Sequence, residues 1–336
     1  MQVEKRYVVA PGEGKSIRLG GLGVDFKLGS EETGDLLSVV EHPIQPGVLV
    51  PPHMHSQEDE YSYVIDGVIG VRIGDREFEA GPGSYILKPR NVPHTFWNAS
   101  REPARLIEII VPGGFEKFFE ELGEQAQHGP PDEGKRMELT DRYGVKNFMD
   151  WVPELTRKHG LTLFGGPPHR QSAMKEADGG YALAHGEGRW TWFLDALLTW
   201  KAVGADSAGQ LEVVEQLGRR GFGPPLHHHK RESEAFYVLE GELTFQLGER
   251  RLRAGPGSFV FVPRTTAHAF VVESEQARFL TVVVPAALKP FLDELSRPAE
   301  APVLPPEPAP LDLERFAQAA DRHGQVMVGP PLEASS

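Results

Sequence analysis

An internal repeat constrains this chain more than any other feature of its sequence. Two sets of eight residues lie 174 positions apart, in the same order and at the same spacing: Gly47, His53, His55, Glu60, Gly67, Gly83, Pro89 and His94 in the first copy, and Gly221, His227, His229, Glu234, Gly241, Gly257, Pro263 and His268 in the second. A repeat of this kind means that each copy folds as the same unit. The chain must therefore form two similar units, each with three histidines and one glutamate at corresponding places.

The pattern within each copy is typical of β-structure. Short alternating segments are bounded by Gly, Pro, Asn or Asp, and no alternation of strands with long helices is visible. Residues 65–67 and 239–241 predict tight turns, and residues 72–75 and 246–249 predict the next hairpin turns. The 29 prolines and 37 glycines fit a chain with many turns. We predict an all-β fold with a sandwich or barrel in each copy.

Short helical segments flank the predicted barrels. Residues 115–122 and 288–295 have apolar side chains at helical spacing, and residues 150–159 and 312–323 each end at a glycine. We predict an N-terminal barrel with its trailing helix in residues 1–125 and a helical connector in 126–175. A C-terminal barrel with its trailing helix follows in 176–297, and a proline-rich connector and a last helix in 298–336. Which barrel each trailing helix covers is open at this point.

Composition excludes several classes of function. A net charge of −13 argues against nucleic acid as a partner, because phosphate binding needs a basic surface. No apolar run approaches the roughly 20 residues that span a bilayer, and no signal peptide is visible at the N-terminus, so we expect a cytoplasmic protein without a membrane partner. The absence of cysteine excludes disulfides, thiolate catalysis and cysteine-ligated zinc. The expected partner is a small-molecule substrate, and a monomer and a homodimer are both open.

The repeated histidines and glutamate predict a metal site in each copy. Alternate side chains of a strand share a face, so the two histidines of each His-x-His pair point the same way. A lone pair of this kind is more often a surface feature, but here the glutamate and the distant third histidine recur as well. Nitrogen and oxygen ligands suit Fe, Mn, Ni, Cu, Co or Zn, with up to one ion per barrel. The predicted ligands are His53, His55, Glu60 and His94, and His227, His229, Glu234 and His268.

Residues near the ligands are candidates for a substrate pocket. Strand parity places Ser62 and Phe236 on the same face as the two glutamates, which predicts that the two pockets differ in polarity. Aromatic walls suit a planar organic substrate, although aromatic residues on barrel strands are more often part of the core. The predicted pocket residues are Ser62, Tyr63, Phe96, Phe236 and Phe270.

The spacing of these residues resembles the motifs of the cupin superfamily. Both copies fit its first motif, G-x5-H-x-H-x3,4-E-x6-G, and Gly83, Pro89, His94 and Asn98 fit the second, G-x5-P-x-G-x2-H-x3-N. Asn91 stands at the inner glycine of that motif. The second copy departs further, with Thr265 at the glycine and Val272 at the asparagine, which puts the turn geometry in doubt rather than the ligands. The resemblance implies two tandem antiparallel barrels of jelly-roll type, hence a bicupin.

The segment from Pro112 to Phe119 is similar to sequences grouped with quercetin 2,3-dioxygenase-like cupins. That resemblance implies a dioxygenase in which a metal held by three histidines and a glutamate chelates a flavonol. It also implies that Glu60 and Glu234 act as catalytic bases that take the substrate hydroxyl proton. Two alternatives stay open: a non-redox metal-dependent isomerase, lyase or decarboxylase, and a small-molecule-binding or storage cupin without turnover.

Overall fold

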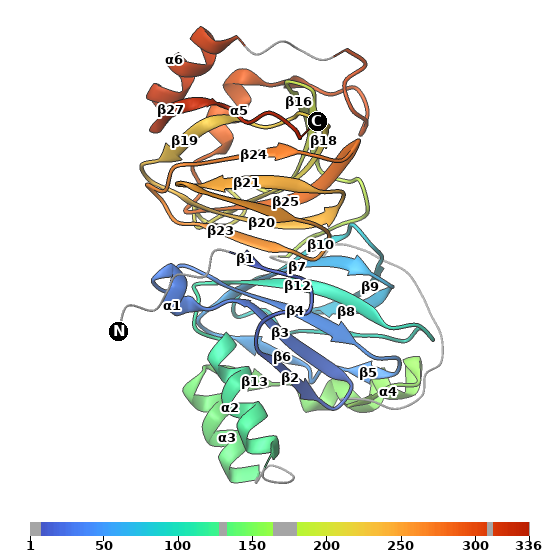
Figure 1. Ribbon diagram of the computed structural model, residues 1–336. Helices are drawn as coiled ribbons and strands as arrows, with labels where there is room; N and C mark the ends of the chain where they lie inside the picture. Colours follow the sequence, from blue (N-terminus) through green and yellow to red (C-terminus); the bar gives the residue numbers. More distant parts are fainter. Residues whose placement is uncertain (1–7, 128–132, 164–179, 308–311, 336) are drawn as a thin grey trace. The chain divides into compact units, whose positions relative to one another are not determined.

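A computed structural model describes residues 8–127, 133–163, 180–307 and 312–335. The chain divides into two compact units. One comprises Gly14–Gly186, and the other comprises Glu187–Ser336 together with the N-terminal residues Met1–Glu13. Figure 1 shows that each unit consists mainly of strands, with a few short helices beside them.

The N-terminal barrel is built from two sheets of mostly antiparallel strands. Its first sheet has the order β15-β10-β7-β12-β4-β3-β2, and its second has the order β13-β6-β11-β5-β14. In the second sheet β8 also pairs with β11, and β9 pairs with β8. The strands of the first sheet are β2 (Ser16–Leu19), β3 (Leu22–Leu28), β4 (Ser38–Ile44), β7 (Asp59–Asp66), β10 (Tyr85–Lys88), β12 (Ala104–Val111) and β15 (Ala182–Leu183). Those of the second are β5 (Val48–Leu49), β6 (His53–His55), β8 (Ile69–Ile73), β9 (Arg76–Ala80), β11 (His94–Trp97), β13 (Val145–Asn147) and β14 (Thr162–Leu163).

The C-terminal barrel repeats this plan. Its larger sheet has the order β1-β23-β20-β25-β18-β17-β16-β26, and its smaller sheet has the order β22-β21-β24-β19-β27. The larger sheet contains β1 (Val8–Val9), β16 (Arg189–Phe193), β17 (Ala196–Ala202), β18 (Glu212–Arg219), β20 (Ser233–Glu240), β23 (Phe259–Val262), β25 (Gln276–Val284) and β26 (Arg297–Pro298). The smaller contains β19 (Pro225–His229), β21 (Leu243–Leu247), β22 (Arg250–Ala254), β24 (His268–Val272) and β27 (Gln325–Pro331). The all-β fold with two tandem, mostly antiparallel barrels, which the resemblance implied, is therefore confirmed.

Strands from outside the repeated segments complete both barrels. Strand β1, near the N-terminus, pairs with β23 of the C-terminal barrel, and β15 pairs with β10 of the N-terminal barrel. The segment predicted as a helical connector supplies two further strands, because β13 pairs with β6 and β14 pairs with β5. In the C-terminal barrel the last strand, β27, pairs with β19 in the same way.

The glycines of the repeat form the turns that close each barrel. Gly67 and its counterpart Gly241 have φ values of 73° and 79°, a left-handed conformation that side chains with a Cβ atom rarely adopt. A Cβ atom on Gly67 would also lie 2.7 Å from the backbone of Ala104. The tight turns predicted between two consecutive strands at these positions are confirmed: Gly67 lies between β7 and β8, and Gly241 between β20 and β21.

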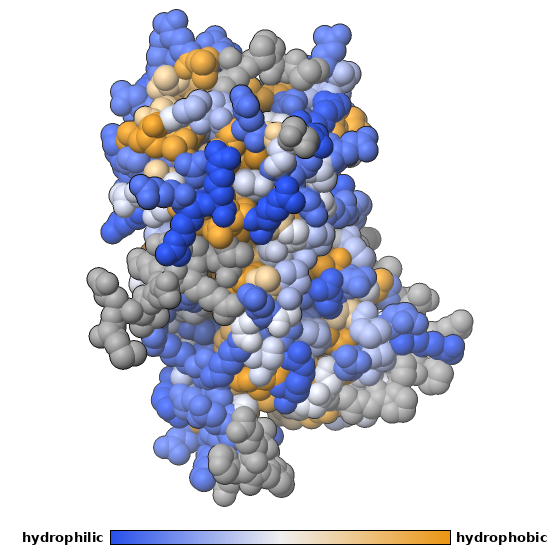
Figure 2. All heavy atoms as spheres, viewed as in Figure 1, coloured by the Kyte–Doolittle hydropathy of each residue, from blue (hydrophilic) through white to orange (hydrophobic). Residues whose placement is uncertain are grey.

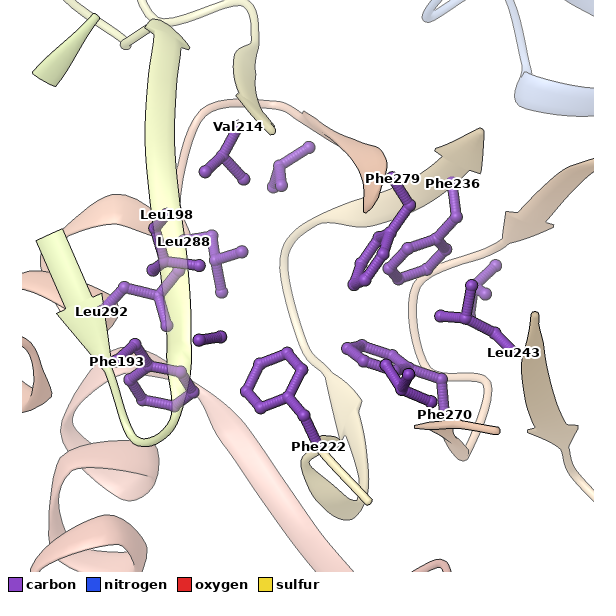
Figure 3. Packing of buried hydrophobic residues seen from close by; sticks show 14 of the residues in the cluster. Phe193, Leu198, Val214, Phe222, Phe236, Leu243, Phe270, Phe279, Leu288 and Leu292 are labelled. Carbon is purple, nitrogen blue, oxygen red and sulfur yellow. The ribbon is translucent and has the colours of Figure 1, made fainter. Parts of the chain in front are cut away.

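The core of each barrel lies between its two sheets. In the N-terminal barrel, buried aliphatic residues such as Val64, Ile69 and Leu106 dominate, together with Phe96. In the C-terminal barrel, phenyl rings take a larger part. Figure 3 shows Phe236, Phe270 and Phe279 gathered together, with Phe222 beside them. The two copies thus share strands and ligands but differ in what fills the interior.

Each helix belongs to the same compact unit as the barrel nearest to it in sequence. They are α1 (Ser30–Thr33), α2 (Glu116–Gln127), α3 (Glu133–Arg142), the 3₁₀ turn η1 (Met149–Trp151), α4 (Val152–His159), α5 (Lys289–Leu295) and α6 (Leu313–His323). Phe115 lies just before α2, and its ring centroid is 4.3 Å from that of His55. Residues of α5 and α6, including Phe291 and Phe316, join the core of the C-terminal barrel. Each trailing helix therefore covers its own barrel.

The exposed surface is largely polar. In the view of Figure 2, apolar residues occur in separate groups among hydrophilic ones. The large apolar side chains that are exposed in the described residues are scattered along the chain, from Leu36 to Val328. Among the described helices, each is too short or too polar to cross a lipid bilayer.

Candidate metal centres

The structure brings the four predicted ligands of the N-terminal barrel together. His53 and His55 come from β6, Glu60 from β7 and His94 from β11, and one potential ligand atom from each lies within 4.8 Å of the others. Register explains the convergence, because His94 is paired directly with His53 across β11 and β6. The Nε2 atoms of His53 and His55 are 3.0 Å apart, and the Nε2 atom of His94 is 3.1 Å from Oε2 of Glu60.

The C-terminal barrel repeats this arrangement closely. His227 and His229 lie on β19, Glu234 on β20 and His268 on β24, and their ligand atoms meet the same 4.8 Å limit. The Nε2 atoms of His227 and His229 are 3.1 Å apart, and Nε2 of His268 is 2.8 Å from Oε2 of Glu234. Each barrel thus has one group of three imidazoles and one carboxylate.

The outer ring nitrogens fix the orientation of these histidines. In the N-terminal centre, Nδ1 of His53 bonds to the carbonyl of Pro51 at 2.7 Å, and Nδ1 of His94 to that of Val92 at 2.9 Å. Because a carbonyl can only accept, Nδ1 carries the proton in both rings. Their Nε2 atoms then turn toward the centre as lone-pair donors, which is the tautomer that a metal ligand requires.

A carboxylate holds the remaining histidine of each centre. Nδ1 of His55 lies 3.0 Å from Oε1 of Glu58, and Nδ1 of His229 lies 2.6 Å from Oε1 of Glu232. Both carboxylates are buried. Such partners orient a ligating imidazole and raise its basicity. These two glutamates lie outside the predicted ligand sets, although they follow the second histidine of each pair by three residues in both copies.

The electrostatics of both centres favour a positive charge at the point where the ligands meet. Burial alone would lower the pKa of His55, but the carboxylates of Glu60 and Glu58 raise it to about 9. The pKa of His229 rises to about 10 for the same reason, through Glu234 and Glu232. Despite their burial, the pKa values of Glu60 and Glu234 are held well below the ordinary value by the cationic groups around them. The donor set therefore fits a divalent cation, and up to one metal per barrel fits the two groups.

The two residues that depart from the cupin glycine keep the turn that a glycine would make. Asn91 and Thr265 have φ values of 62° and 66°. The backbone N–H of Asn91 donates to the carbonyl of His55 at 2.7 Å, and that of Thr265 to the carbonyl of His229 at 2.8 Å. The turn is thereby anchored to a ligand residue in each barrel. Left-handed geometry is unusual for a β-branched threonine, so its retention shows how strongly the surrounding strands determine it.

The predicted pocket residues divide between the two faces of their strands. Ser62 lies on β7, two residues after Glu60, and its hydroxyl donates to Glu108 at 2.9 Å. Strand alternation turns Tyr63 to the face opposite Glu60 and Ser62, and its role in a substrate pocket stays a prediction. Its register partner on β10 is Tyr85.

The predicted phenylalanines lie near the centres as part of packed clusters. Phe96 follows His94 by two residues on β11, and its ring centroid is 5.1 Å from Nζ of Lys88. Phe236 and Phe270 have ring centroids 5.7 Å apart in the C-terminal barrel. Their role in binding a substrate stays a prediction.

The comparisons with known proteins agree with this geometry. Residues 41–110 and 214–283 both match the family described as the cupin domain. The chain is 26% identical over 319 residues to quercetin 2,3-dioxygenase of Bacillus subtilis (strain 168), which covers 93% of this chain and 92% of the relative. Its fold is similar to that of a variant of Bacillus subtilis oxalate decarboxylase, with a TM-score of 0.58 at 16% identity, covering 85% of this chain and 78% of the other. A structure of the same decarboxylase described by its Mn(II) centres gives the same TM-score, identity and coverage.

Proposed function

The chain is a bicupin, with one cupin domain in each half, and on that premise we propose that it is a metal-dependent dioxygenase for a small phenolic or enolic substrate of the flavonol type. The observation that carries the proposal is the combination of two complete sets of three histidines and one glutamate with similarity to a quercetin 2,3-dioxygenase along 93% of the chain. A set of four protein ligands leaves coordination positions for a substrate.

The side chains of each centre have separate parts in the proposed reaction. A bound metal would supply Lewis acidity that lowers the pKa of a coordinated hydroxyl group, and a redox-active ion would allow reaction with O2. The three imidazoles hold the site as neutral donors, oriented through their Nδ1 atoms. Glu60 and Glu234 accept the hydroxyl proton of the substrate on a carboxylate oxygen. In the N-terminal barrel, the ring of Phe115 packs against His55 and shields that ligand from water.

A second candidate is a non-redox lyase or decarboxylase, in which the metal acts only as a Lewis acid. The fold is shared with oxalate decarboxylase, and the ligand set serves either class of chemistry. The buried ammonium group of Lys88, 2.8 Å from Glu60, favours a substrate with anionic oxygen atoms in this case too. A binding protein without turnover is the third candidate. Consumption of O2 separates the first candidate from the other two.

Elemental analysis and an oxygen electrode test this proposal together. The protein is purified without added metal, alongside His55→Ala and His229→Ala variants. We expect about two equivalents of a redox-active ion in the unaltered protein, about one in each variant, and O2 uptake when quercetin or a catechol is added. Metal-loaded protein that consumes no O2 with flavonols or catechols, but releases CO2 from a small carboxylic acid, would replace the dioxygenase by the decarboxylase. Protein that binds no metal would overturn both.

A further inference from the structure

A chain of buried polar groups extends from the ligand Glu60 into the N-terminal barrel. The Nζ atom of Lys88 lies 2.8 Å from Oε2 of Glu60 and 2.8 Å from Oε2 of Glu108. The hydroxyl of Ser62 completes the chain by donating to the other oxygen of Glu108. Lys88 and Glu108 each expose 1% of their surface. A charged network that is wholly buried thus adjoins one metal centre.

The C-terminal barrel has no such network at the matching positions. Lys88 faces Glu60 across β10 and β7, whereas Val262 faces Glu234 across β23 and β20. At a second matching position, the C-terminal barrel has Thr281 where the N-terminal barrel has Glu108. Glu108 faces Ser62, and in the other barrel Thr281 faces Phe236.

Phenyl rings occupy the corresponding interior of the C-terminal barrel. The ring centroid of Phe236 is 5.1 Å from that of Phe245, and the centroid of Phe270 is 5.2 Å from that of Phe279 (Figure 3). Glu234 contacts only the centre's own histidines among the described ion pairs. Within the described part of the chain, its carboxylate has no ammonium partner of the kind that Lys88 gives to Glu60.

The second barrel acts as an internal control for the first. Removing an ammonium and a carboxylate from water is costly, and well-packed apolar residues often stabilise a core equally well. This chain shows that the same barrel accommodates valine, threonine and phenylalanine at those positions. This type of barrel therefore does not in general require charged residues at these positions. Buried charged groups next to a metal centre are instead typical of functional sites.

Lys88 acts on the N-terminal centre through Glu60. The ammonium group holds Oε2 of Glu60, which also lies 3.1 Å from His94, while Oε1 lies 3.3 Å from His55. This fixes the carboxylate and withdraws part of its negative charge from the centre. We propose that Lys88 is a positioning residue that specialises the N-terminal centre for an anionic oxygen ligand, such as a deprotonated phenol or enol, and that the C-terminal centre, with Val262 at the matching position, binds such a ligand more weakly. The identity of that ligand rests on the proposed function, but the inequality of the two centres does not.

Single-centre proteins test this proposal with azide as an anionic probe. His229→Ala leaves only the N-terminal centre, and His55→Ala leaves only the C-terminal one. Each is loaded with Co(II), and azide binding is followed by the visible absorption of the ion. We expect the N-terminal centre to bind azide at least tenfold more tightly, and Lys88→Met to remove most of that difference. In the protein with only the C-terminal centre, Lys88→Met should leave the Co(II) spectrum unchanged.

Further variants keep the test decisive if Lys88→Met folds poorly. Glu108→Gln leaves Lys88 in place but removes its second carboxylate, so azide affinity at the N-terminal centre should rise. Lys27→Met removes another buried lysine, whose Nζ lies 3.2 Å from Glu41, and should leave azide affinity unchanged. Equal azide affinity at both centres, or the same change with Lys27→Met as with Lys88→Met, would overturn the proposal. Because azide binding requires no turnover, a lack of O2 uptake with quercetin counts against the dioxygenase alone.

Discussion

The Nδ1 atom of His55 lies 3.0 Å from Oε1 of Glu58, and the same relationship joins His229 to Glu232 at 2.6 Å in the other barrel. Both carboxylates orient a ligand without contacting the predicted ion themselves. We expect Glu58→Gln to weaken metal binding at the N-terminal centre by about 10- to 100-fold, because an amide is a weaker acceptor than a carboxylate. Glu232→Gln should do the same at the C-terminal centre.

Chelator competition in single-centre proteins measures this effect. Each glutamate variant is the matched control for the other, because the two centres have the same ligands. Glu58→Gln combined with His55→Ala should leave the metal affinity of the C-terminal centre unchanged. Equal weakening of both centres by either variant would contradict a local orienting role.

We expect substitutions of Lys88 and Glu108 to have strongly non-additive effects on the stability of the metal-free protein. Lys88→Met leaves Glu60 and Glu108 buried without their cation, and should lower the free energy of unfolding by about 3 kcal/mol. Glu108→Gln should cost less, since burial raises the pKa of Glu108 to about 7 and eases its neutralisation. The double variant should be more stable than the sum of the two losses predicts. Urea denaturation of all four proteins checks this, and additive losses would contradict the coupling.

We expect the stability of the protein to depend on pH through the buried side chain of His42. Burial lowers its pKa from the ordinary value of 6.5 to about 4, while its hydrogen bond to the carbonyl of Gly23 opposes the shift. The nearby charges of Lys88, Glu60 and Asp25 act on it more weakly. The unfolded chain takes up a proton near pH 6.5 and the folded one does not. The stabilisation is therefore complete above pH 6.5 and is lost as the pH falls toward 4.

The variant that tests this is His42→Gln, because Gln216 occupies the equivalent place in the C-terminal barrel. Between pH 7 and pH 5, the unaltered protein should lose about 2 kcal/mol more of its free energy of unfolding than the variant does. Denaturant titrations at the two pH values give this difference. Parallel losses in both proteins would assign the pH dependence to other groups.

We expect that the N-terminal barrel has no room for a side chain at Gly70. Gly70 faces Trp97 across β8 and β11, and a Cβ atom at Gly70 would lie 2.1 Å from the indole ring. Trp97 cannot move freely, because it packs against His159, with the two ring centroids 4.7 Å apart. Gly70→Ala should therefore destabilise the protein by about 3 kcal/mol.

Gly81→Ala is the matched control for this substitution. The atom nearest to a Cβ there is 4.0 Å away, and the backbone is not left-handed. We expect a change in melting temperature of only a degree or two for Gly81→Ala and of several degrees for Gly70→Ala. Similar melting temperatures of the two variants would mean that the indole ring of Trp97 moves to make room for the added methyl group.

The repeat made the fold and the ligands predictable. His53, His55, Glu60 and His94 recur with their partners at a constant offset, and strand alternation then dictates which of them share a face. The same alternation places Tyr63, which is buried, on the face of β7 opposite Glu60. Helix ends were readable for a similarly local reason, since the side chain of Asp312 accepts the N–H of Arg315 and Gly324 ends α6.

Other features depend on pairings that a single sequence does not reveal. The equivalence of Glu108 and Thr281 is hidden because the constant offset fails in the last strand: Glu60 faces Ile110, and Glu234 faces Val283, which lies 173 residues further on. Strands β1, β13, β15 and β27 are too short or too irregular to be recognised by periodicity. Each joins a sheet through partners distant in sequence.

The sequence by itself therefore determined the duplication, the barrel type and the eight candidate ligand residues, because these follow from local periodicity and from chemistry repeated in two copies. Only the tertiary structure decided which charges meet inside the barrel. Lys88 reaches Glu60 and Glu108 across three paired strands, and that encounter depends on strand register, bulges and packing between residues far apart in the chain. The two centres have the same candidate ligands in the sequence, but only the tertiary structure shows that Lys88 contacts Glu60 in one barrel and that Val262 stands at the matching position in the other.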